Sequence, residues 1–338
     1  MRVVPVAFSV ILLVLGGVPS WSGEERLPLL GRRAQIDAAR VDLDPRDPKR
    51  TRVGGLVFLG GVRLTSRDPA FGGFSALHVR GDRFTLLSDG GNIVRFRMGT
   101  DWQPYGLAFA NLPGGPGIGW DKRDRDSESL AVDPATGRAW VGFENSGAIW
   151  RYAPGLARAQ AQAVPRGMGS WSDNGGPESL AWLSGGRFVA ISESSPVPAR
   201  AWNGTRRARL RSRDARLFFG DPTAGRTPRA RFAYVPVGGY DPADAAALPS
   251  GDLVVLDRKF ALPYRWSNRI SVVPARRVAA GRVARGRLVA TLAPPLIHDN
   301  FEGIATSREG ADTILWLVSD DNRSAWQRSL LLKFRLAR

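Results

Sequence analysis

Glu128-Ser129-Leu130-Ala131 is a four-residue pattern (an acid, a small residue, an apolar residue and alanine) that recurs along the chain. It returns as Glu178-Ser179-Leu180-Ala181, as Glu302-Gly303-Ile304-Ala305 and, more loosely, as Asp244-Ala245-Ala246-Ala247. A fifth segment, Ser75-Ala76-Leu77-His78, stands in the same phase without the acid. The segments follow one another at intervals of 50 to 66 residues, a spacing typical of β-propeller blades.

Each segment is followed by a turn that carries glycine and then by an apolar run that ends in an acid. The five acids that end these runs are Asp89, Glu144, Glu193, Asp257 and Asp320. Short apolar, β-branched and aromatic runs joined by such turns are typical of β-hairpins. The sequence therefore predicts an all-β propeller of about five blades. The long interval from 178 to 244 leaves room for a sixth blade, although its arginine-rich stretch 206–213 is interpreted as an insertion loop.

The segment Gly55–Leu59 reads as a strand but has no hairpin partner of its own. We expect it to pair with Leu330–Leu336 as the outer strand of the last blade, which would close the ring and protect both strand edges.

The N-terminus predicts a secretory signal peptide over residues 1–22. Met1-Arg2 precedes an apolar run of about 16 residues, shorter than the ~20 that a spanning helix needs. Residues 23–52 are expected to be a linker or strap, and 53–338 the propeller domain. The mature protein is expected in the periplasm or outside the cell, without a membrane span once the signal is cleaved, and as a monomer. An uncleaved anchor is the alternative.

Composition narrows the function classes. The 338 residues carry a formal charge of +17, no cysteine and two histidines, which excludes thiolate metal sites and cysteine nucleophiles. All but four of the 48 basic residues are arginine, so the surface should attract small anions such as phosphates. Export, and the lack of a basic stripe interleaved with aromatics, argue against nucleic acid as a partner.

The repeated acids are predicted to meet at one end of the central channel, because the start of one strand lies beside the end of its antiparallel neighbour. Expected neighbours are Glu128 with Glu144, Glu178 with Glu193, Asp244 with Asp257, Glu302 with Asp320, and Ser75 with Asp89. Such a group of carboxylates suits a hard cation, and Ca²⁺ fits an extracytoplasmic site without cysteine. The candidate ligands are Asp89, Glu128, Glu144, Glu178, Glu193, Asp257, Glu302 and Asp320.

Two other interpretations of the acids stay open. Arginines that flank the same loops could neutralise them, or the acids could be architectural and hold the blade junctions together. Candidate catalytic residues are Glu128, Glu178, Glu302 and His298, a histidine in a polar loop. Candidate substrate-binding arginines are Arg125, Arg258 and Arg323. His78 alternates with apolar neighbours and is expected to be structural.

The chain resembles the bacterial family named for the esterase-like activity of phytase. The resemblance lies in 126–131, 176–181 and 300–305, in Phe74-Ser75-Ala76-Leu77 with Leu87-Ser88-Asp89, and in the closing stretch 317–322. It implies an exported propeller that hydrolyses phosphoric or carboxylic esters. We therefore expect a Ca²⁺-dependent phosphoesterase acting on a small phosphorylated substrate. The alternatives are a non-catalytic propeller that binds an anionic ligand or a protein, and a calcium propeller of the lactonase or esterase type.

Overall fold

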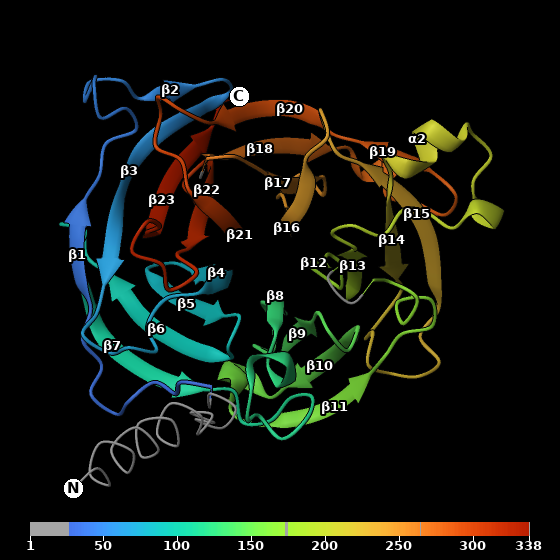
Figure 1. Cartoon of the computed structure of the whole chain (residues 1–338), viewed down its shortest axis with the longest axis horizontal. Coiled ribbons are helices and arrows are strands. Elements are labelled where there is room, and N and C mark those ends of the chain that lie inside the picture. The colour runs from blue at the N-terminus through green and yellow to red at the C-terminus, as the bar shows by residue number, and fades with distance from the viewer. Residues whose placement is uncertain (1–26, 173–174, 264, 338) are drawn as a thin grey trace, which may run out of the picture.

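The chain is an all-β ring of five sheets around a central channel, as seen in a computed structural model (Figure 1). The structure describes residues 27–172, 175–263 and 265–337; the predicted signal peptide lies outside them. The prediction of a propeller is confirmed, with five blades rather than six.

The first three blades follow the chain in order. Blade one contains β4 (Phe74–Arg80), β5 (Arg83–Ser88), β6 (Asn92–Met98) and β7 (Pro104–Asn111). Blade two contains β8 (Ser127–Val132), β9 (Ala139–Phe143), β10 (Ala148–Tyr152) and β11 (Ala159–Ala163). Blade three contains β12 (Ser179–Leu183), β13 (Arg187–Ile191), β14 (Arg213–Phe218) and β15 (Arg229–Val235), with β19 (Val283–Arg285) parallel to β15.

Blade four contains β16 (Asp241–Ala247), β17 (Leu253–Ala261), β18 (Arg265–Val273) and β20 (Arg287–Leu292). Blade five contains β21 (Asn300–Glu309), β22 (Asp312–Asp320) and β23 (Ser329–Leu336), and its outer strand β3 (Leu56–Thr65) comes from the N-terminal part of the chain. Leu336 lies opposite Leu56 in this pair, so the predicted closure is confirmed. Two short strands, β1 (Asp37–Arg40) and β2 (Arg52–Val53), pair with β3.

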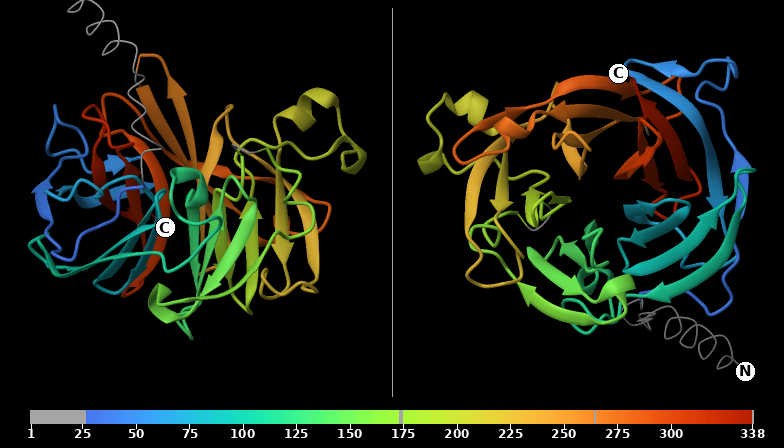
Figure 2. Two further views of the ribbon diagram at one scale, coloured as in Figure 1. Left: turned by 60° about the horizontal axis from the view of Figure 1, so that its bottom comes forward. Right: turned by 180° about the vertical axis from the view of Figure 1, so that it is seen from behind.

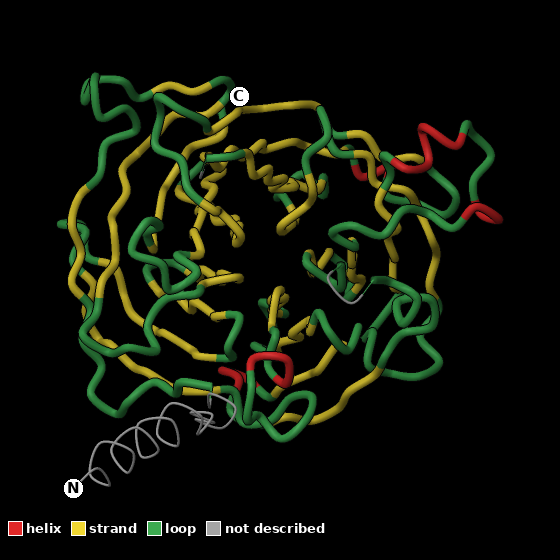
Figure 3. Tube along the Cα trace, viewed as in Figure 1, coloured by secondary structure: helices red, strands yellow, loops and turns green. Residues whose placement is uncertain are grey.

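In the part of the chain that the structure describes, helix is confined to short connections, as Figure 3 shows. The arginine-rich stretch after β13 forms α2 (Arg206–Leu210), and single 3₁₀ turns occur at η1 (Lys122–Asp124), η2 (Pro154–Leu156), η3 (Ala199–Ala201) and η4 (Ala275–Arg277). Among the described residues, no helix is long and apolar enough to cross a membrane. The arginine-rich stretch lies between β13 and β14, which pair in one sheet. The long interval between 178 and 244 is therefore an insertion in blade three and not a further blade.

Neighbouring blades are joined by large side chains and by buried hydroxyls. Trp140 of blade two packs edge-on against Phe188 of blade three at 4.6 Å between ring centroids, and Phe84 against Trp316 at 4.7 Å. The Ser127 hydroxyl donates to the Ser88 carbonyl at 2.7 Å, linking blades two and one. Two further views show the resulting ring from the side and from behind (Figure 2). This rigid ring fixes the ends of the five innermost strands, β4, β8, β12, β16 and β21, around the channel.

Candidate functional site: a carboxylate cavity at one end of the channel

The predicted acids meet in a cavity of about 540 Å³ where the inner strands begin. We call it the acid mouth. Its charged lining comprises eight carboxyl groups and three basic groups: Asp89, Glu128, Glu144, Glu178, Glu193, Asp241, Glu302, Asp320, Lys122, Arg258 and Lys259. In a chain of charge +17, this local excess of acid is the opposite of the overall balance.

Strand bulges place these side chains in the acid mouth. The ladder between the two inner strands skips Glu128 in blade two, Glu302 in blade five and Ser75 in blade one. A bulged residue leaves the strand pairing and its side chain is redirected. Sequence periodicity identified these positions but not the bulge that orients them.

In blade four the predicted pairing of Asp244 with Asp257 is wrong. The bulge falls at Ala243, so Asp244 lies opposite Leu256 and Asp257 opposite Pro242. A slip of one residue moves a side chain to the other face of a strand. Ala243 therefore takes the position that Glu128 holds in blade two, and Arg258 takes the position of Glu144.

Both displaced acids have buried partners elsewhere. Asp244 accepts the backbone N–H groups of Ala245 at 2.7 Å and of Ile304 in blade five at 2.8 Å, so its role is architectural. Asp257 accepts the Tyr234 hydroxyl at 2.8 Å. Burial raises the pKa of Asp257 to about 7, although the Tyr234 hydrogen bond partly opposes the shift. Asp257 is thus removed from the predicted metal ligands.

Arg258 lies among three of the acids. It pairs with Glu302, and its Nη2 lies 3.0 Å from Glu193 Oε1 and 4.0 Å from Glu178 Oε2. Burial alone would lower the pKa of Arg258, but the carboxylates of Glu178 and Glu193 outweigh it and raise the pKa. Of the three arginines predicted to bind substrate, this one is in the acid mouth, where it also neutralises part of the acid group.

Lys122 neutralises acids of blades one and two in the same way. Its Nζ lies 3.0 Å from Asp89 Oδ2 and 3.4 Å from Asp126 Oδ1. The residue is held by the 3₁₀ turn η1, where the Asp121 side chain accepts the Asp124 N–H. Burial opposes the charge, yet Asp89 and Asp126 raise the pKa of Lys122.

Three acids of the acid mouth, Glu128, Glu144 and Asp320, form no ion pair with any described basic side chain. Burial and the charges of Asp126 and Asp89 raise the pKa of Glu128 well above its usual value. Burial and Asp126 raise that of Glu144 to about 7, and burial and Asp89 raise that of Asp320 to about 7. The acid mouth therefore holds more carboxyl groups than its basic residues can neutralise, and the unpaired ones tend to keep a proton in the absence of a cation.

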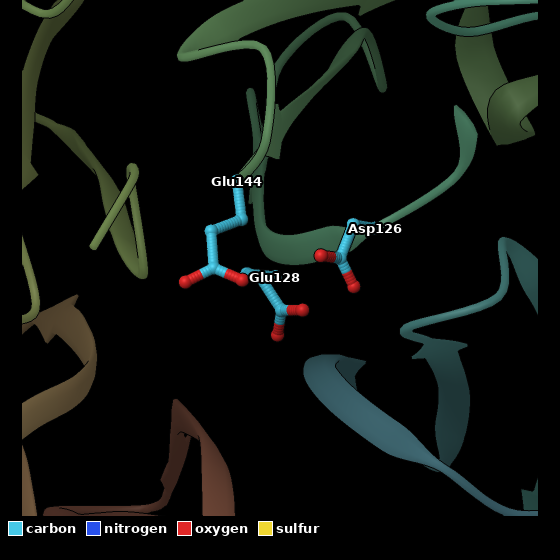
Figure 4. A group of neighbouring side chains, drawn as sticks. All are labelled: Asp126, Glu128 and Glu144. Atoms are coloured by element: carbon cyan, nitrogen blue, oxygen red, sulfur yellow. The ribbon is translucent and has the colours of Figure 1, made fainter. Parts of the chain in front are cut away.

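Two groups of three carboxylates come close enough to share an ion. Oxygens of Asp126, Glu128 and Glu144 lie within 4.8 Å of one another, and so do those of Glu144, Glu178 and Glu193. Figure 4 shows the first group, whose carboxylates lie near one another at the start of β8 and the end of β9 in blade two. Gly176 permits the second, because a Cβ there would lie 2.6 Å from Glu144 Cα, so only glycine lets the loop bring Glu178 so near.

The donor set fits a hard divalent cation. All the candidate ligands are oxygens, which Ca²⁺ and Mg²⁺ prefer, and no thiolate or imidazole lies among them. The buried Oδ1 of Asp89 also receives no hydrogen bond from the described residues. Because Glu144 belongs to both groups of three, it is the side chain best placed to bind a cation.

Three other predicted residues lie outside the lining of the acid mouth. The His298 ring donates from Nδ1 to the Leu296 carbonyl at 2.7 Å, Arg125 donates to the Pro116 carbonyl at 2.6 Å, and Arg323 donates to Asn92 at 3.3 Å. Each of these contacts secures a loop. The remaining predicted acids, Asp89, Glu128, Glu144, Glu178, Glu193, Glu302 and Asp320, do line the acid mouth.

Several residues of the site were not predicted. They are Lys122, Asp126, Asp241, Lys259, Phe260, Trp266 and Asn300. The dense charges of 121–128 were a signal for the first two. Phe260 and Trp266 belong to the β17–β18 hairpin, and their ring centroids are 4.8 Å apart. No pattern in the sequence pointed to these two residues.

The family model described as phytase-like, esterase-like activity of phytase, matches residues 69–323. The chain belongs to this family. The match spans the acid mouth from Asp89 to Asp320, so the family residues include the whole carboxylate cavity. A search of curated proteins finds no significant match.

Solved structures resemble the ring at low identity. Hydrazine synthase of Kuenenia stuttgartiensis is 12% identical with a TM-score of 0.36, covering 74% of this chain, and this chain spans only 57% of that one. Myxococcus xanthus glutaminyl cyclase is 10% identical (TM-score 0.42, 79% of this chain and 91% of that one). A luciferin-regenerating enzyme is 13% identical (0.43, 89% and 98%). Similarities this distant carry no argument about the reaction.

Proposed function

We propose that the protein is an exported, divalent-cation-dependent phosphoesterase that acts at the acid mouth. The observation that supports it best is the coexistence, in one cavity, of uncompensated carboxylates with Arg258 and Lys122. Carboxylates alone would repel a phosphate ester, and basic residues alone would hold no cation.

Asp126, Glu128 and Glu144 are the residues that would hold the cation, which we take to be Ca²⁺. A bound divalent cation polarises a phosphoryl oxygen and lowers the pKa of a water. Arg258 would shift one of its N–H groups from a carboxylate to a phosphate oxygen, and Lys259 and Lys122 line the same cavity. Glu178, whose pKa burial and Glu128 raise, can hold a proton for the leaving oxygen.

A carboxylic ester is the second candidate substrate. Phe260 and Trp266 line the same cavity and offer an apolar surface to an uncharged acyl or aryl group. The family description names an esterase-like activity, which supports hydrolysis of a carboxylic ester as the second candidate reaction.

The test is product release by the purified mature chain from p-nitrophenyl phosphate, phytate and p-nitrophenyl acetate, each with calcium or with EDTA. We expect calcium-dependent phosphate release that falls at least 100-fold in Glu128→Gln and Glu144→Gln. Asp133→Asn, an acid outside the acid mouth, should leave the rate unchanged.

Each other outcome has its own meaning. Release from the acetate alone would replace the phosphoesterase by an esterase. If the unmodified protein releases product from none of the substrates, and the Glu128→Gln and Glu144→Gln variants bind calcium as it does, the protein is better described as a non-catalytic propeller. Sequencing the N-terminus of the secreted chain tests export, and an intact Met1 would contradict cleavage of the signal.

A further inference from the structure

A second charged cavity lies outside the channel, between blades two and three. It has a volume of about 490 Å³ and is formed by the loop after β11 together with β14, β15 and η3. Five arginines line it: Arg166, Arg200, Arg216, Arg229 and Arg231. We call it the arginine pocket.

One acid, Asp214, forms ion pairs with arginines of this group. Asp214 is buried and accepts two hydrogen bonds from Arg216, at 2.6 and 2.8 Å, and one from the Trp171 indole at 3.0 Å. Arg216 is only 3% exposed and also donates to the Gly167 carbonyl at 2.9 Å. Asp214 and Arg216 therefore form a neutral, fully bonded floor that holds the loop in place.

The other four arginines keep their charge above this floor. Arg231 Nε lies 3.0 Å from Asp214, which Arg216 already neutralises. Arg166 and Arg200 form no ion pair with any described residue, and Arg229 donates to the Thr227 carbonyl only. Burial, with Arg216 and Arg200 nearby, lowers the pKa of Arg231, as expected where positive charges face one another.

A second groove continues from the arginines, with which it shares Ser170 and Arg200. We call it the serine groove, because four serines line it together with small apolar residues: Ser170, Ser172, Ser194, Ser195, Pro196, Pro198 and Ala199. The Ser172 hydroxyl contacts those of Ser194 at 2.8 Å and Ser195 at 3.3 Å. Serine hydroxyls both donate and accept, so they suit a ligand that itself carries hydroxyl groups.

We propose that the arginine pocket binds a small phosphorylated polyol, with the phosphate on Arg166, Arg229 and Arg231 and the hydroxylated body along the serine groove. One guanidinium group can donate two parallel N–H···O hydrogen bonds to a phosphate. Several guanidinium groups together favour a doubly charged phosphate over a singly charged anion. The cavity is concave with a buried floor, which suits a small molecule better than an extended polymer.

The test measures binding by calorimetry, in EDTA, of glucose 6-phosphate, inorganic phosphate and glucose to the mature chain. Without a cation the acid mouth repels phosphate, so the result does not depend on the proposed enzyme activity. We expect glucose 6-phosphate to bind more tightly than phosphate, and glucose not to bind. Arg166→Gln with Arg229→Gln should weaken glucose 6-phosphate at least tenfold.

The control removes the same charge elsewhere. Arg46→Gln with Arg63→Gln changes two exposed arginines of the N-terminal part of the chain and should bind as the unmodified protein does. An equal loss in both double variants would reduce the effect to net charge and overturn the proposal. Equal affinity for phosphate and glucose 6-phosphate would overturn the assignment to a polyol.

Discussion

Arg258 shows how one side chain decides the character of the acid mouth. It is a basic residue at the position where the other four blades carry an acid, and it bonds to carboxylates of blades three and five. Buried charges are tolerated when they are paired, and removing one partner is far costlier than replacing the whole set. Arg258 thus permits Glu178, Glu193 and Glu302 to lie close together.

Arg258→Gln is expected to destabilise the protein by about 3 kcal/mol at pH 8, because it leaves these carboxylates without their counter-charge. The deficit should shrink toward pH 5, where the carboxyls take up protons. Urea unfolding at both pH values measures it, with Arg63→Gln as the exposed control. A deficit that is equal at both pH values would show that lost packing, and not charge, is the cause.

Three acids with raised pKa values give the metal-free protein a pH dependence. Glu144, Asp257 and Asp320 titrate near 7 in the folded state and near 4 when unfolded. Between these values the folded state binds more protons, so stability is greatest at the acid end and falls as pH rises toward 7. The loss should be on the order of 2 kcal/mol or more.

Unfolding in EDTA from pH 4.5 to 8 measures this slope. Asp257→Asn removes one titrating group without touching the acid mouth and should flatten the curve in part. Stability that rises steadily over this range would contradict the raised pKa values.

At the scale of elements, the hairpins and the closing strand were predictable and the bulges were not. Five apolar runs that follow glycine turns mark the second strand of each blade, and Gly55–Leu59 lacked any other partner. Asp244 was misassigned because Asp-Ala-Ala-Ala imitates the repeat, while the bulge lies one residue earlier at Ala243. The partner of Asp257, Tyr234, lies on another blade, and no local pattern announces such a contact.

The outer strand β3 gives a test of ring closure. Val62 lies opposite Leu331 on one side and Arg40 on the other, and it is fully buried. Val62→Pro removes an N–H from this ladder and should cost about 1–3 kcal/mol beyond Val62→Ala, which removes only side-chain contacts. Thermal unfolding compares the two. Equal costs would mean that β3 adds side-chain packing only and that its backbone pairing is dispensable.

At the scale of the whole molecule, the ring brings to one opening acids that lie far apart in the sequence. The repeat predicted this gathering, since equivalent positions of a closed ring face the same axis. Which acids keep a free charge depends on Lys122 and Arg258, whose reach is a property of the folded ring. A pattern of acids alone does not contain that information.

Calcium should therefore stabilise the folded ring by binding to the carboxylates at its opening. At a concentration 100 times its Kd, a ligand of the folded state adds about 2.7 kcal/mol. Melting with and without calcium measures the gain, which Glu144→Gln should largely abolish and Asp133→Asn should not. An undiminished gain in Glu144→Gln would place the cation elsewhere.

The shared blade of β3 and β23 also sets an order of events during synthesis. β3 leaves the ribosome before the strands of all five inner hairpins, while β23, its neighbour in the ring, follows them. Throughout that interval β3 has no native partner on that side, and its exposed edge can pair with other chains. The ring cannot be completed until β23 arrives, so a chain stalled just before β23 would carry four finished blades and an open one.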